Sequence, residues 1–143
     1  MLLDIAGKKI MVDVAGDIMG TSFSYDRTLK DVLKNYRIHT LDMIFISHFD
    51  KDHYGNLVYL LDDFKVKKIC FYKDIATEDV KQKLIEKGVE YINPEKFEWI
   101  DFGDGVKLKM YKSSKALKGN NRSLVFTLNA VSYTHLRAHE TLR

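Results

Sequence analysis

Four side chains that can bind a metal ion fall within six consecutive positions of this 143-residue chain. They are His48, Asp50, Asp52 and His53, inside the segment Ser-His-Phe-Asp-Lys-Asp-His-Tyr-Gly-Asn at residues 47–56. The segment follows an apolar run at residues 43–46 that is typical of a buried strand. Divalent metals need several ligands that converge on one point, so a cluster of this kind at a strand end favours a metal site.

The spacing indicates how these side chains could share ions. In an extended turn His48, Asp50 and Asp52 point the same way, whereas His53 points elsewhere and could serve a second ion. Two metals about 3.5–4 Å apart can hold the attacking and leaving oxygens of a hydrolytic displacement, and a metal lowers the pKa of bound water to about 7. The carboxylates favour harder ions such as Mn²⁺ or Mg²⁺, and Zn²⁺ stays a candidate.

Two other interpretations of the cluster are weaker. A single His-Asp pair is usually a surface ion pair or a helix cap, but four such groups directly after a buried strand are not explained in that way. A calcium loop starting at Asp50 would have the required D-x-D opening and a glycine at its sixth position. Its fifth position is Tyr54 and its twelfth is Leu61 instead of glutamate. These two residues exclude the EF-hand pattern.

The composition is that of an ordinary globular domain. Apolar residues make up 45% of the chain and charged residues 30%. We expect no signal peptide, and no apolar run approaches the roughly 20 residues that cross a bilayer. The only cysteine, Cys70, excludes an intrachain disulfide and is predicted to be a packed core thiol. The net charge of +3 indicates a solvated surface, while a weak footprint for a polyanion stays open.

The apolar periodicity predicts an α/β fold with a mixed sheet flanked by helices. Residues 26–36 carry apolar side chains at helical spacing, and residues 41–47 are apolar almost throughout, which indicates a strand buried on both faces. The metal-binding segment is expected to be a loop. We predict helices at residues 26–36, 55–64 and 77–87, the last with Thr77 as its N-cap. Strands are predicted at residues 2–5, 8–14, 41–47, 67–72, 89–92, 97–101, 106–111 and 123–128.

The motif resembles the H-x-H-x-D-H signature of the metallo-β-lactamase fold superfamily. It is more closely similar to the H-x-D-x-D-H variant in the C-terminal domain of the ComEC family of DNA-uptake competence proteins. Three further segments resemble that family in the same order: a strand ending in Asp near a Gly at residues 12–16, the apolar strand at residues 41–47, and the N-x-x-S-L-V strand at residues 120–125. The resemblance covers about residues 1–129.

The resemblance implies the N-terminal half of an αββα sandwich and a role for each residue. His48 and Asp50 would bind a first metal, and Asp52 and His53 a second, with one or two divalent ions such as Zn²⁺ or Mn²⁺. Asp52 would also orient the nucleophilic water as the catalytic residue. Asp13 would hold the ligands by hydrogen bonds, although a strand-end cap is an equal interpretation of Asp13.

The implied activity of the intact parent is metal-dependent hydrolysis of a phosphodiester, with DNA as the partner. The superfamily's remaining ligands come from later segments, and residues 109–112 lack the mid-chain histidine, so we expect a partial domain at residues 1–129 with weakened activity.

Residues 130–143 resemble a translated sequencing adapter and are predicted to be a non-native tail, in which His135 and His139 would have no metal role. The alternatives are a superfamily hydrolase of another ester, thioester or amide, and a non-catalytic module that binds metal or nucleic acid. The membrane context and localisation of the parent stay open.

Overall fold

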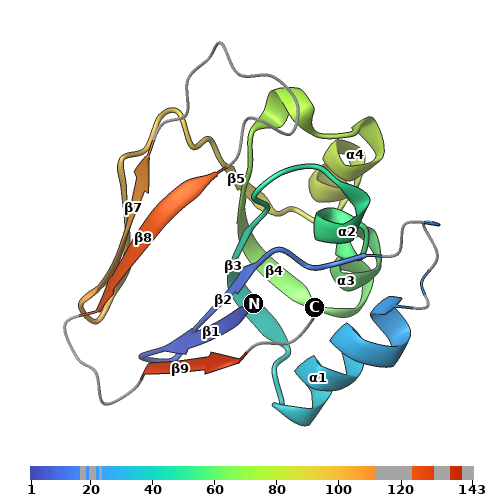
Figure 1. Ribbon diagram of the computed structural model, residues 1–143, viewed down its shortest axis with the longest axis horizontal. Coiled ribbons are helices and arrows are strands. Elements are labelled where there is room, and N and C mark those ends of the chain that lie inside the picture. The colour runs from blue at the N-terminus through green and yellow to red at the C-terminus, as the bar shows by residue number, and fades with distance from the viewer. Residues whose placement is uncertain (17–18, 20–21, 23, 112–123, 131–135, 140–143) are drawn as a thin grey trace.

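A computed structural model describes residues 1–16, 19, 22, 24–111, 124–130 and 136–139. It has three layers: helices, a large mixed sheet, and a small antiparallel sheet (Figure 1). The large sheet contains β1 (Leu2–Ile5), β2 (Lys8–Val12), β3 (Thr40–Phe45), β4 (Lys65–Cys70) and β5 (Glu90–Ile92). The α/β class and the mixed sheet predicted from the sequence are therefore confirmed.

The large sheet has the strand order β5-β4-β3-β2-β1. β1 and β2 form an antiparallel hairpin. The hairpin turn contains Gly7 at φ 80°, a conformation that suits glycine. β2, β3, β4 and β5 pair in parallel, so their C-terminal ends lie along one edge of the sheet. β9 (Leu136–His139) adds an antiparallel strand on the free side of β1.

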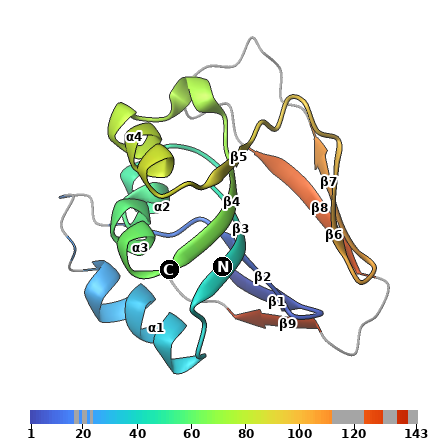
Figure 2. The ribbon, with the colours of Figure 1, turned by 180° about the vertical axis from the view of Figure 1, so that it is seen from behind.

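The helices cover one face of the large sheet (Figure 2). The first is a π-helical turn, η1 (Tyr25–Leu29), which continues directly into α1 (Lys30–Asn35). The others, in chain order, are α2 (Lys51–Tyr54), α3 (Leu57–Asp63), a short 3₁₀ turn η2 (Lys73–Ile75), and α4 (Glu78–Glu86). Apolar side chains at helical spacing point inward, among them Leu29 and Leu33, which are fully buried. The Tyr25 hydroxyl donates a hydrogen bond of 2.6 Å to Asp63, which lowers the pKa of that carboxyl and ties η1 to α3.

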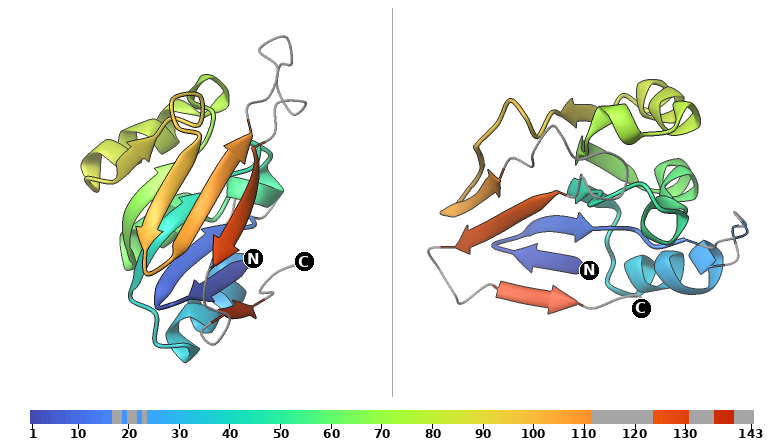
Figure 3. Two further views of the ribbon diagram at one scale, coloured as in Figure 1. Left: turned by 90° about the vertical axis from the view of Figure 1, so that its left-hand side faces the viewer. Right: turned by 45° about the horizontal axis from the view of Figure 1, so that its top comes forward.

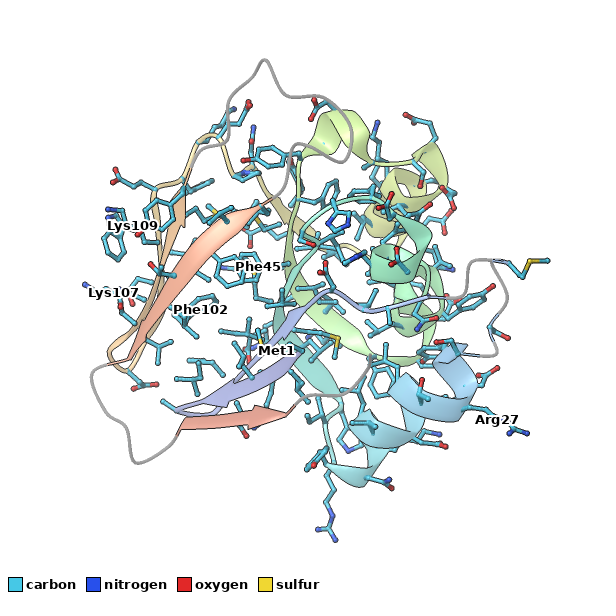
Figure 4. All side chains as sticks on the ribbon, viewed as in Figure 1. Met1, Arg27, Phe45, Phe102, Lys107 and Lys109 are labelled. Atoms are coloured by element: carbon cyan, nitrogen blue, oxygen red, sulfur yellow. The ribbon has the colours of Figure 1, made fainter. Side chains whose placement is uncertain are left out.

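The small sheet packs on the opposite face of the large one (Figure 3). It consists of β6 (Trp99–Gly103), β7 (Val106–Tyr111) and β8 (Val125–Ala130), paired antiparallel in the order β6-β7-β8. Figure 4 shows Phe45 and Phe102 between the two sheets, while Lys107 and Lys109 point away from them. The Phe45 and Phe126 rings stack with their centroids 4.7 Å apart across this core.

Several local expectations are confirmed and others need correction. Cys70 is fully buried, and burial raises the pKa of its thiol to about 12. Strand β3 is buried on both faces as predicted. Thr77 precedes α4, but its hydroxyl makes no capping hydrogen bond, and the oxygen has no partner among the described residues. The helices lie on one face of the large sheet only, because the small sheet occupies the other.

The structure forms regular elements in two segments for which no helix or strand was predicted. Residues 51–54, predicted as part of a loop, form helix α2. Residues 136–139, which fall within the tail predicted at residues 130–143, pair with β1, so His139 is in a strand, while His135 lies outside the described residues. Across the described ranges, no helix is long and apolar enough to span a bilayer.

The packing of the two sheets predicts that residues of β7 that face the large sheet contribute far more to stability than residues that face away from it. Leu108 is fully buried between the sheets, so Leu108→Ala should lower the free energy of unfolding by about 2–5 kcal/mol. The neighbouring Lys107 is exposed on the outer face. Lys107→Ala should therefore change the free energy of unfolding by about 0.5 kcal/mol or less. Urea unfolding followed by circular dichroism measures both, and equal effects would contradict the sandwich packing.

Candidate functional site

The candidate site forms where the neighbouring strands β2 and β3 end. Val12 is paired with Phe45 in parallel register, so the chain leaves both strands at the same edge of the sheet. The Asp13 amide continues the ladder by donating to the Phe45 carbonyl oxygen at 2.8 Å. Asp13 then takes a left-handed conformation with φ 54°. Asp tolerates this conformation better than most residues do, and it ends the strand.

The carboxylate of Asp13 connects the two strand ends. Its Oδ1 accepts a hydrogen bond of 2.8 Å from the Ser47 amide, and its Oδ2 accepts one of 2.7 Å from the Ser47 hydroxyl. Oδ2 also lies 3.0 Å from Nδ1 of His53. Asp13 therefore makes both kinds of contact considered from the sequence, one with the backbone at a strand end and one with a candidate ligand.

Helix α2 brings His53 back beside His48. The amides of His53 and Tyr54 both donate to the Asp50 carbonyl oxygen, at 2.8 and 3.1 Å, which closes a helical turn. The His53 carbonyl oxygen accepts from the Val14 amide at 2.9 Å. The prediction of an extended turn with alternating side chains is therefore wrong, because these local hydrogen bonds fold the segment back on itself. The two imidazole rings lie with centroids 3.8 Å apart.

The four candidate ligands form two His-Asp pairs. Nε2 of His48 lies 3.4 Å from Oδ2 of Asp50, and Nε2 of His53 lies 3.6 Å from Oδ2 of Asp52. This is the grouping in which the resemblance places them. Within the part of the chain that the structure describes, no three His, Cys, Asp or Glu side chains gather around one point.

In each histidine, Nδ1 lies within hydrogen-bonding distance of another side chain, and Nε2 lies near a carboxylate oxygen. Nδ1 of His48 lies 3.0 Å from the Ser47 hydroxyl, and Nδ1 of His53 lies 3.0 Å from Asp13. A tetrahedral ion with bonds of about 2.0–2.1 Å separates two of its ligand atoms by about 3.4 Å. The donor atoms of each pair therefore have a spacing that is compatible with sharing one ion, and each pair would supply two of about four ligands.

The surrounding contacts hold this segment in place. Phe49 packs against the core, and its ring centroid lies 4.9 Å from that of Tyr54 and 5.2 Å from that of Phe71. Asn56 is fully buried, and its side-chain amide donates to the Val14 carbonyl oxygen at 3.0 Å. The Leu124 amide donates to the Ser47 carbonyl oxygen at 2.9 Å, which connects the segment to the small sheet.

Ser47 is a site residue to which the sequence alone assigned no role. The only local indication of a role for Ser47 is that its hydroxyl directly precedes His48. That role depends on the hydrogen bond to Asp13, which is 34 positions away. Most of the N-x-x-S-L-V segment, residues 120–123, lies outside the described residues, and Leu124 is buried.

No protein-family model matches the chain, and no curated protein matches it.

The packing of Phe49 predicts that it holds the candidate ligands in place. The side chain is partly buried against the core. Phe49→Ala should therefore lower the free energy of unfolding by about 1–3 kcal/mol and broaden the NMR signals of the His48 and His53 rings. Phe49→Leu, which keeps apolar volume, is the matched control and should retain sharp signals. Unbroadened ring signals in Phe49→Ala would contradict this anchoring role.

Proposed function

We propose that this chain is part of a metal-dependent hydrolase that cleaves phosphodiesters, with DNA as the substrate of the intact parent. One observation carries the proposal: both histidines are tethered through Nδ1 and present Nε2 beside a carboxylate oxygen. In most metal-binding histidines, the ring nitrogen that does not bind the metal donates a hydrogen bond to a carboxylate or another acceptor.

The residues would divide the work in the following way. His48 and Asp50 would hold one divalent ion, and Asp52 and His53 would hold a second, with Zn²⁺ or Mn²⁺ as the ions that suit mixed nitrogen and oxygen ligands. The chemistry that such a metal would supply is a water molecule that ionises near neutral pH. The Asp52 side chain is 62% exposed, more than the other three, so one of its oxygens can accept a hydrogen bond from the attacking water and orient it.

The layer arrangement supports the relation to the metallo-β-lactamase fold. Helices cover one sheet, and a second sheet packs on that sheet's other face, which is the order of layers expected for the first part of an αββα sandwich. The candidate ligands follow the C-terminal end of β3. This is the edge at which open α/β sheets bind their ligands.

A non-catalytic metal-binding module is the second candidate function. One observation favours it: each His-Asp pair provides only two donors, and no third ligand joins either pair among the described residues. Such a module would bind metal through the same four side chains but would not turn over substrate. Metal binding and cleavage therefore need separate measurements.

The paired donors predict metal binding that depends on His48 and His53. In calorimetric titrations with Zn²⁺, His48→Ala and His53→Ala should each weaken binding by about tenfold or more, because each removes one of few ligands. His39→Ala is the matched control, since His39 is an exposed histidine next to the opposite end of β3. Equal affinity of all three variants and the wild type would contradict a metal site at this position.

The proposed role of Asp52 predicts a loss of cleavage without loss of the fold. In the intact parent, Asp52→Asn should lower Mn²⁺-dependent cleavage of DNA by about 100-fold or more, because the amide is a poorer metal ligand and orients water differently. Asp62→Asn is the control, as Asp62 is an exposed carboxylate on α3 that forms an ion pair with Lys83 at 2.6 Å. If Zn²⁺ binds but neither the wild-type parent nor its Asp62→Asn variant cleaves DNA, the non-catalytic function is favoured.

A further inference from the structure

A single carboxylate oxygen reaches both histidines of the candidate site. Oδ2 of Asp13 lies 3.0 Å from Nδ1 of His53 and 2.7 Å from the Ser47 hydroxyl. The same hydroxyl lies 3.0 Å from Nδ1 of His48. Asp13 therefore contacts His53 directly and His48 through Ser47.

The direction of each hydrogen bond follows from what each group can donate. An ionised carboxylate only accepts, so the Ser47 hydroxyl donates its single proton to Asp13. The hydroxyl oxygen then has only lone pairs to offer His48, and Nδ1 of His48 must be the donor. Nδ1 of His53 must likewise donate to Asp13. Both imidazoles consequently carry their proton on Nδ1 and keep a lone pair on Nε2.

We infer that Ser47 is a positioning residue that, together with Asp13, fixes both histidines in the Nδ1–H form. One partly buried carboxylate would then prepare both His-Asp pairs for an ion at the same time. The proton positions follow from the protein's own hydrogen bonds alone, whereas their consequence for ion binding rests on the proposed function.

The hydroxyl can be removed without disturbing the other contacts of Ser47. The Ser47 amide donates separately to Oδ1 of Asp13, and the Ser47 carbonyl oxygen accepts from Leu124, so both remain in Ser47→Ala. Ser47→Thr keeps a hydroxyl and should preserve the connection to His48. Asp13 has a positive φ, and Asp13→Asn keeps a residue that tolerates this conformation but replaces one acceptor oxygen with a donor.

Nitrogen-15 NMR of the imidazoles in the metal-free full chain tests this inference, at an alkaline pH where an ordinary imidazole is neutral. The wild type and Ser47→Thr should show His48 and His53 in the Nδ1–H form. Ser47→Ala should shift His48 toward the Nε2–H form and leave His53 unchanged, whereas Asp13→Asn should perturb both. A His48 tautomer that is unchanged in Ser47→Ala, or a wild type with Nε2–H on either ring, would overturn the inference.

Zn²⁺ titration of the same proteins tests the consequence for ion binding. Ser47→Ala should weaken binding by about 10–100-fold, the usual effect of losing a group that orients a metal ligand, and Ser47→Thr should restore it. Unchanged affinity in Ser47→Ala would overturn the positioning role. If the wild type binds no Zn²⁺ while the tautomers behave as expected, the proposed metal-dependent function fails and the assignment of the proton positions stands.

Discussion

The parallel pairing of β2 with β3 is the constraint on which the candidate site depends. It places the residue after β2 next to the residue after β3, so that Asp13 can accept hydrogen bonds from both the amide and the hydroxyl of Ser47. A shift of register by one residue would reverse the side on which every strand residue points and would remove this contact. The apolar residues of β3 are buried on both faces, because helices pack on one side of this strand and the small sheet packs on the other.

The segment that carries the candidate ligands is short and polar, yet neighbouring elements contact it on several sides. Phe49 anchors it in an aromatic cluster, helix α2 folds it back, and the Leu124 amide connects it to the small sheet. Rigid support of this kind would matter for the proposed metal site, because donors that are held in place before an ion arrives need little ordering on binding. The same hydrogen bonds that set the geometry also set which nitrogen of each histidine is available.

Several features could be predicted from residue types and their spacing alone. The apolar runs and their turn residues indicated the strands of the mixed sheet, and the burial of Cys70 followed from its place within one of them. Helix α2 could not be predicted, because its four residues carry no apolar periodicity and the turn is closed by main-chain contacts with Asp50. The pairing of residues 136–139 with β1 was missed for a related reason, since strand partners distant in sequence leave no local pattern.

The sequence by itself determined which chemical groups are present at residues 48–53, and that they follow a buried strand. It also placed an aspartate at the end of an earlier strand, with two interpretations open. Only the tertiary structure decided that Asp13 contacts both Ser47 and His53, so that one carboxylate connects the ends of β2 and β3 to the candidate site. The physical reason is that these relations join residues up to 40 positions apart, and such contacts are set by strand register and loop packing instead of local propensity.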